Sequence, residues 1–271
     1  MRQRFRPVRL LASASLIALV AASLGGCTAM SKLSDVTGSI GPKAEDTAPA
    51  DPARAVEVYG ERYRANPKDA DAALGYGQAL RANGQRAQAA AVLEQATIAN
   101  PSNKPLLAQY GRALTDVGNF QQAFDVLSKA HSPDNPDWRL LSVQGTCLDQ
   151  MGRHDEARAY YASALKIAPG DPGVLSNLGL SYMLSRDLPK AEEALRQAYA
   201  SPRASSRVRQ NLGLVVGLQG RFAEAETIVK ADLPPDQAAA NVAYLKDMMS
   251  RNNNPRGAAK RTPVASLSQP D

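Results

Sequence analysis

Residues 138–171 read WRLLSVQGTCLDQMGRHDEARAYYASALKIAPGD, and this stretch decides the fold. Two segments with helical periodicity flank the dipeptide Gly152-Arg153, which is typical of a turn between helices. Small residues at Gly145 and Ala157 allow two helices to approach closely, and the larger residues around them fill the space between. We therefore expect Gly145 and Ala157 to face each other where the two helices cross.

The same spacing returns every 34 residues in five units, which begin at Ala70, Lys104, Trp138, Pro172 and Ser206. The eighth position of every unit is glycine: Gly77, Gly111, Gly145, Gly179 and Gly213. The twentieth is always alanine, and four units carry a turn glycine whose place is taken by Arg186 in the other unit. A period of this length indicates an all-α repeat array, in which each unit buries its apolar face against its neighbours.

These columns resemble the tetratricopeptide repeat (TPR) family over residues 51–250. The resemblance implies a right-handed α-solenoid, or superhelix, of antiparallel helix pairs. Two departures stand out in the chain. The fourth position, aromatic in the family, is Ala73, Leu107, Leu141, Leu175 and Arg209. In the last repeat Asp232 replaces the alanine of position 27, so we expect that repeat to be the most distorted.

Incomplete units flank the five repeats. Residues 51–69 match the second half of a repeat and are predicted to cap the first end. After Pro234-Pro235, Asp236 is expected to N-cap a last helix over 236–250. Its apolar stripe is predicted to cover the last repeat: Val242, Leu245, Met248 and Met249. Residues 251–271 contain Asn, Pro and Ser and are predicted to be disordered.

The first 26 residues have a basic start and an apolar run from Leu10 to Leu24, which is short for a membrane span. We predict a signal peptide over 1–26. It ends in Leu24-Gly25-Gly26-Cys27, which resembles the bacterial lipobox, so Cys27 is the predicted lipidation site. The alternative is an ordinary signal peptide with an incidental cysteine. Residues 27–50 lack the composition for a core and are predicted to form a flexible tether.

The net charge of +6 is concentrated at the two ends. The first 26 residues hold four arginines and no acid, and residues 251–271 hold four basic residues and one acid. The repeats themselves are therefore close to neutral. A nucleic-acid partner would require clustered basic residues on the folded body, so we predict none.

The candidate chemical groups are few. With Cys27 lipidated, only Cys147 remains, in a column of small packing residues, so a buried unreactive thiol is expected. His131 and His154 lack a partner at metal-ligand spacing, and surface or capping roles are expected for them. The sequence thus predicts no catalytic residues, no metal, no cofactor and no small-molecule substrate: the protein is not an enzyme.

The resemblance implies a protein-binding groove lined by the first helix of each repeat. Its ninth positions are Gln78, Arg112, Thr146, Leu180 and Leu214, and its twelfth positions are Arg81, Thr115, Asp149, Met183 and Gly217. The groove changes from polar to apolar along the array. Asn177 and Asn211, at position 6, are expected to hydrogen-bond the backbone of a bound peptide. In the alternative, Leu214 and its neighbour Leu218 pack against the C-terminal helix instead.

The chain after the last repeat is the most specific feature. Pro234-Pro235 and the run Ala240-Asn241-Val242-Ala243-Tyr244-Leu245 resemble the TadD lipoprotein family of tight-adherence (Tad) Flp pilus systems. The resemblance implies an outer-membrane lipoprotein that faces the periplasm and binds pilus-assembly proteins, with the secretin as the suspected partner. Thr28 after the lipidated cysteine favours the outer membrane. Other repeat lipoproteins remain as alternatives: a type IV pilotin, an adaptor for envelope hydrolases or a scaffold in outer-membrane protein assembly.

Overall fold

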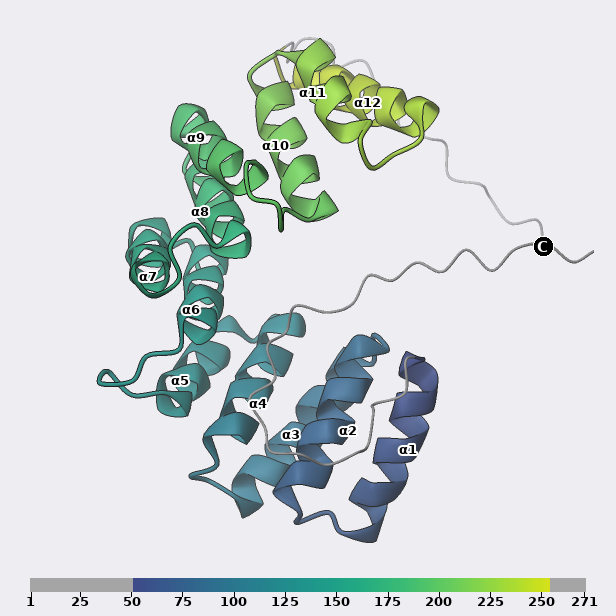
Figure 1. Cartoon of the computed structure of the whole chain (residues 1–271), viewed down its shortest axis with the longest axis vertical. Coiled ribbons are helices and arrows are strands. Elements are labelled where there is room, and N and C mark those ends of the chain that lie inside the picture. Colours follow the sequence, from purple (N-terminus) through teal and green to yellow (C-terminus); the bar gives the residue numbers. More distant parts are fainter. Residues whose placement is uncertain (1–50, 254–271) are drawn as a thin grey trace, which may run out of the picture. The chain divides into compact units, whose positions relative to one another are not determined.

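The computed structural model describes residues 51–253, which form twelve helices and no β-strand (Figure 1). The all-α fold class is therefore confirmed. The predictions for the signal peptide, Cys27, the tether and residues 254–271 lie outside the described residues. The helices are α1 (Pro52–Ala65), α2 (Ala70–Ala82), α3 (Arg86–Ala99), α4 (Lys104–Asp116), α5 (Phe120–Ala130), α6 (Trp138–Gln150), α7 (His154–Ile167), α8 (Pro172–Leu184), α9 (Leu188–Tyr199), α10 (Ser206–Leu218), α11 (Phe222–Val229) and α12 (Pro235–Asn253).

The helix boundaries follow from caps and turn residues. Each first helix (α2, α4, α6, α8 and α10) has 13 residues and begins at the first position of its 34-residue unit. Four of them have an N-cap side chain that accepts hydrogen bonds from the first turn: Asp69, Asn103, Asp137 and Asp171. The turn before each second helix requires a left-handed residue, with φ of +77 to +85° at the glycines and +63° at Arg186.

The close approach within a repeat is centred on glycine, which meets the large side chain of position 24. A Cβ at Gly145 would lie 2.6 Å from the ring of Tyr161, so the Tyr161 side chain lies directly over Gly145. The same holds for Gly111, whose added Cβ would meet Leu127 at 2.5 Å. The large residue of position 24 thus fills the space over the glycine. Ala157 is fully buried within the same cluster.

The C-terminal helix differs from its prediction at both ends. α12 begins at Pro235, so Asp236 lies in the first turn of the helix and does not cap it. The helix also continues to Asn253, three residues beyond the predicted end. Leu245 is buried and its methyl group lies over Gly217, whereas Met248 is 46% exposed. Val242 and Met249 are half-buried, so Met248 is the one residue of the predicted stripe that is exposed.

The two departures in the last repeat compensate each other. Arg209 Nε lies 2.6 Å from Asp232 Oδ2, and a second guanidinium nitrogen contacts the other carboxylate oxygen. The hydrogen bonds to Asp232 raise the pKa of Arg209. In the preceding repeats the same two positions form apolar contacts in buried clusters, for example Leu175 with Ala198. An ion pair thus takes the place of an apolar pair, and α11, with eight residues, is the shortest helix of the described part.

Candidate functional site

The first helices of successive repeats pack against each other, from α2 to α4, α6, α8 and α10, and then against α12. Within the described residues the second helices contact first helices, and α11 also contacts α12. We call the surface formed by α2, α4, α6, α8 and α10 the first-helix wall. It carries all the predicted groove residues.

The first half of this wall is polar and basic. Gln78 is exposed, and Arg112 is half-buried with an Nε that has no hydrogen-bond partner. Burial and the positive charge of Arg81 lower the pKa of Arg112. Arg81 itself is held by Asp116, with 2.6 Å between Arg81 Nε and the carboxylate oxygen. Arg112 is therefore a half-buried cation on this wall, and its Nε is a buried donor without a partner.

In the middle of the wall the polar side chains are hydrogen-bonded within the protein. The Tyr161 hydroxyl donates to Asp149 at 2.9 Å, and Ser181 Oγ donates to the same carboxylate at 2.7 Å. His154 Nδ1 lies 2.9 Å from it as well. Thr146 donates to the Ser142 carbonyl oxygen at 3.1 Å. Asp149 is buried, so this predicted groove position does not face a partner.

Asn177 and Asn211 link neighbouring repeats. Asn177 Nδ2 donates to Ser142 Oγ at 3.1 Å, and Asn211 Nδ2 donates to Ser176 Oγ at 2.9 Å. Both serines are buried. The two asparagine amide groups therefore hold first helices together, a role that the sequence did not predict.

The second half of the wall is apolar. Leu180 is half-buried, and Leu214 is 37% exposed on the next first helix. Met183 packs partly against the buried cluster around Leu212 and Val215. Leu180 and Leu214 occupy equivalent positions on two helices in contact, so the apolar part of the predicted groove is accessible on both.

The other singled-out residues are embedded in the packing. Cys147 is fully buried, lies 3.4 Å from Thr115 Oγ1 and has its thiol pKa raised by burial. His131 Nε2 lies 3.0 Å from Gln144 Oε1, at the end of α5. The described residues contain no group of His, Cys, Asp and Glu able to hold a metal ion. None of their helices has the length and apolar character that crossing a bilayer requires.

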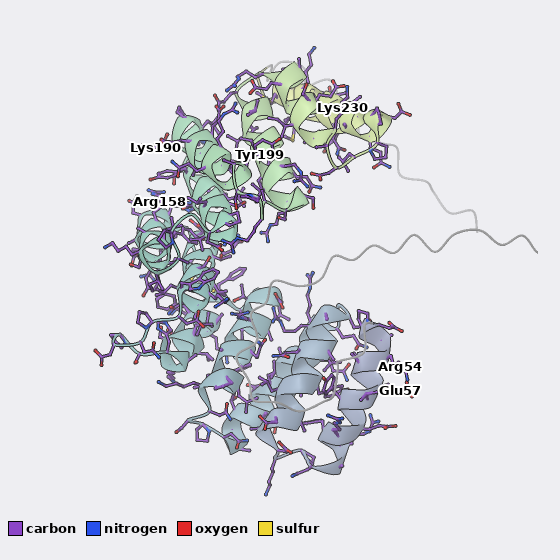
Figure 2. The ribbon with its side chains drawn as sticks, viewed as in Figure 1. Arg54, Glu57, Arg158, Lys190, Tyr199 and Lys230 are labelled. Atoms are coloured by element: carbon purple, nitrogen blue, oxygen red, sulfur yellow. The ribbon has the colours of Figure 1, made fainter. Side chains whose placement is uncertain are left out.

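A second surface lies where each second helix packs on the next repeat; we call these four contacts the outer junctions. A side chain at position 21 fills three of them. At the second junction Phe124 packs edge-on against Tyr160, with 5.5 Å between ring centroids. At the third, the Arg158 guanidinium lies 5.0 Å from the centre of the Tyr182 ring, and Lys190 Nζ lies 5.6 Å from it. Arg158 and Lys190 are labelled in Figure 2.

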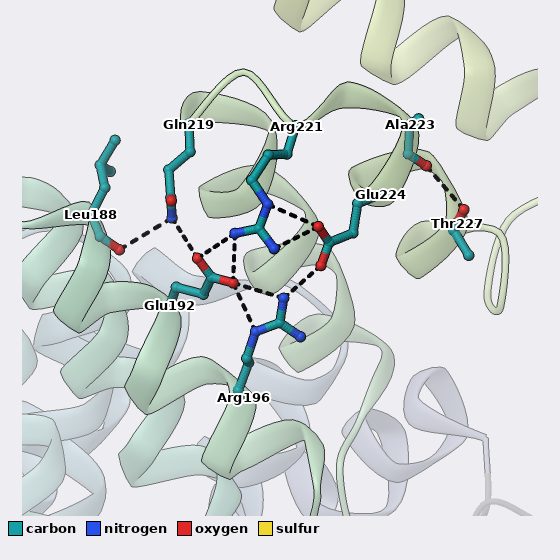
Figure 3. A network of polar contacts seen from close by, with 8 residues as sticks. All are labelled: Leu188, Glu192, Arg196, Gln219, Arg221, Ala223, Glu224 and Thr227. Carbon is teal, nitrogen blue, oxygen red and sulfur yellow. Dashed lines mark hydrogen bonds and ion pairs between the residues drawn. The ribbon is translucent and has the colours of Figure 1, made fainter.

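The fourth outer junction is an ion network (Figure 3). Glu192, at position 21, lies 2.7 Å from both Arg196 and Arg221 and accepts a hydrogen bond from Gln219 at 2.8 Å. Glu224 contacts the same two arginines. Burial alone would raise the pKa of Glu192, but the hydrogen bonds from Arg221, Gln219 and Arg196 lower it.

Comparison with known proteins also identifies the chain as an array of helical repeats. A family model described as tetratricopeptide repeat matches residues 114–176 and 148–213, and the model for anaphase-promoting complex, cyclosome, subunit 3 matches residues 54–130. Over residues 114–213 this chain is a tetratricopeptide repeat protein. No significant match was found among curated proteins.

The structure of this chain is similar in fold to solved structures of TPR proteins, and three of them share a low sequence identity with this chain. PilW, described as a widely conserved type IV pilus biogenesis factor, gives a TM-score of 0.62 at 18% identity, over 71% of this chain and 91% of PilW. TTC0263, a thermophilic TPR protein of Thermus thermophilus, gives 0.57 at 21% identity, over 65% and 98%. The APC/C hetero-tetramer Cut9-Hcn1 gives 0.58 at 16% identity, over 73% of this chain and 40% of that one.

The outer junctions were missed by the sequence reasoning, although the TPR register contains their signal. Position 21 reads Ala90, Phe124, Arg158 and Glu192 along the first four repeats. One small residue among three large ones marks a junction that is not filled from within the chain.

Proposed function

We propose that this TPR protein is a non-enzymatic scaffold lipoprotein that binds partner proteins along the first-helix wall and supports assembly of a Tad/Flp pilus secretion apparatus. Cys27 would anchor it by lipid to the outer membrane, facing the periplasm, and its partner would be the secretin or another pilus-assembly protein. The observation that most directly supports the proposal is the accessible apolar half of the wall, at Leu180 and Leu214.

Three features support the proposal. Packing of the first helices on one another makes a continuous surface available to an extended or helical segment. Each leucine side chain buried by a partner contributes about 1.5–3 kcal/mol before association costs. Arg112 at the other half of the wall is half-buried and positively charged, and this charge favours a segment whose opposite end carries an acidic group.

The assignment to Tad pili rests on the sequence after the last repeat. Within the run from Ala240 to Leu245, Leu245 is buried while Tyr244 is 71% exposed. The run therefore both seals the repeat array and presents an aromatic side chain. The similarity to PilW is one of fold, and it agrees equally with the alternative of a pilotin-like lipoprotein in another type IV pilus system.

The test uses the full-length lipoprotein in cells that make Flp pili. Leu180→Glu and Leu214→Glu place a carboxylate in the predicted apolar contact, which is strongly unfavourable if a partner buries it. We expect both variants to lose co-purification of the secretin and to lose pili by electron microscopy. Ile167→Glu is the matched control, since Ile167 is an aliphatic residue on a second helix and 44% exposed.

Circular dichroism establishes that each variant is folded. If folded Leu180→Glu and Leu214→Glu proteins still retain the secretin and support pili, the first-helix wall is not the binding site. If the secretin is absent from wild-type material but another envelope protein is retained through Leu180, the alternative function is favoured.

A further inference from the structure

The first outer junction, between α3 and the second repeat, contains a cavity of about 410 Å³. This volume is within the usual range of ligand pockets. The corresponding places in the next three junctions hold Phe124, Arg158 and Glu192. Here position 21 is Ala90, so the cavity is the space that a large side chain occupies elsewhere in the same chain. Its lining residues are Ala87, Ala90, Ala91, Glu94, Tyr110, Leu114, Val117, Asn119 and Gln122.

The lining residues restrict the chemistry of an occupant. Ala90, Ala91 and Leu114 offer an apolar floor, and Glu94 is the one charged side chain of the lining. The Tyr110 hydroxyl accepts a hydrogen bond from Gln122 Nε2 at 3.0 Å. Burial, followed by the nearby Glu94 carboxylate, raises the pKa of Tyr110. Glu94 is exposed and makes no salt bridge with any residue of the part that the structure describes, and the Tyr110 hydroxyl is hydrogen-bonded to its carboxylate.

The neighbouring junctions show which side chain fits such surroundings. Phe124 is held by the aromatic ring of Tyr160, but the residue equivalent to Tyr160 at the first junction is Val126. Arg158 instead crosses to the next repeat, where its guanidinium donates to Ser185 Oγ at 2.8 Å and pairs with Asp155. An arginine at this kind of junction therefore places its guanidinium over the side chain of position 11 in the next repeat and ends on polar acceptors.

We propose that the cavity of the first outer junction binds an arginine side chain presented by a partner protein. The aliphatic stem would lie against Ala90 and Leu114, and the guanidinium would pair with Glu94. Arginine suits the place better than lysine because its planar fork donates two parallel hydrogen bonds to one carboxylate. This site is separate from the first-helix wall and does not depend on the proposed pilus role.

The test measures binding of capped tripeptides to the isotopically labelled full-length protein by NMR. The probes are acetyl-Gly-Arg-Gly-amide, its lysine counterpart and its phenylalanine counterpart. We expect saturable shifts of the amides of Ala90, Glu94 and Val117 with the arginine peptide at millimolar concentration, and weaker responses to the other two.

Two variants identify the groups responsible. Glu94→Gln keeps the shape and removes the charge, so the dissociation constant for the arginine peptide should rise roughly threefold to tenfold while that for the phenylalanine peptide is unchanged. Ala90→Arg should fill the cavity from within, as Arg158 does at the third junction, and abolish the response. If Ala90→Arg does not fold, Glu94→Gln still decides the question.

Three results would overturn the assignment: an equal response to lysine, a preference for phenylalanine, or no saturable response to any peptide. An unchanged affinity of Glu94→Gln for the arginine peptide would do so as well. Because Leu180 lies on the other surface, Leu180→Glu should bind the arginine peptide like the wild type, so the outcome is independent of the test of the first-helix wall.

Discussion

Replacing Arg209 and Asp232, singly and together, tests whether the last repeat is held by compensating departures from the repeat pattern. The changes are Arg209→Leu and Asp232→Ala, which restore the residue types found at these positions in the other repeats. In those repeats the two positions share buried clusters, as Leu141 does with Ala164.

The expected size of the effect follows from burial. The Arg209 side chain is 24% exposed and that of Asp232 is 11% exposed, so each single change leaves the other charge mostly buried without its partner. Loss of a hydrogen-bonded partner costs about 1–3 kcal/mol in such a setting. The double change removes both charges and reinstates an apolar contact, which is often neutral or stabilising for a buried ion pair. We expect the double variant to lie within about 1 kcal/mol of the wild type.

Urea denaturation followed by circular dichroism gives the free energies of unfolding for the four proteins. Since a repeat array can unfold in parts, hydrogen exchange of the α10 and α11 amides should accompany it. The expected coupling energy is at least about 1 kcal/mol. If the two single effects add to within about 0.5 kcal/mol, the residues act independently and the compensation is refuted.

Four further predictions concern other parts of the chain. Gly145→Ala should lower stability, because a Cβ placed 2.6 Å from the Tyr161 ring overpacks the helix contact by about 1–3 kcal/mol, more than the roughly 1 kcal/mol gained in helix propensity; an unchanged melting temperature would contradict it. Arg186→Gly should stabilise the protein by about 1 kcal/mol, since φ of +63° strains any residue with a Cβ, and urea titration checks the sign. Cys147 should resist thiol reagents at neutral pH because burial raises its pKa, and rapid labelling of the native protein would refute this. Above about pH 8.5 the native state keeps a thiol proton that the unfolded state loses, so the free energy of unfolding should decline as the pH rises past that value. Cys27→Ser should leave an unprocessed precursor without lipid label, and normal palmitate incorporation with outer-membrane fractionation would exclude lipidation at Cys27.

Helix identity and repeat spacing could be predicted because they depend on local signals. The glycine before each second helix, such as Gly84, marks the turn, and the N-cap residues, such as Asp69, mark the start of the first helices. The glycine of position 8 also predicted a close helix contact. The pattern shows which residues are small, but not which facing side chain extends over them, so the contact of Tyr161 with Gly145 was not predicted.

The site residues were harder to predict because their roles depend on neighbours in other repeats. Asp149 stands at a groove position, yet Tyr161, Ser181 and His154 turn its carboxylate into an internal acceptor. Among the five full repeats only this one has a tyrosine hydroxyl at position 24, so a rule taken from the others could not reveal the bond. The cavity beside Ala90 was hidden for a related reason, since Ala90 is one of six alanines in α3 and nothing in that helix sets it apart.

The four outer junctions, each with its own chemistry, fix the order of the repeats. The repeats share one length and the same glycine positions, but the side chains that they place at the outer junctions differ. Removal of residues 138–171 would preserve the 34-residue phase and bring Phe124 opposite Tyr182 and Lys190, in surroundings that now receive Arg158. Phe124 would also lose the ring of Tyr160. Such a shortened chain should melt well below one that lacks only a terminal helix, and equal melting temperatures would show that the units are exchangeable modules. The repeats can therefore not be reordered freely, and the duplication or deletion of one unit in evolution would create a mismatched outer junction that lowers stability.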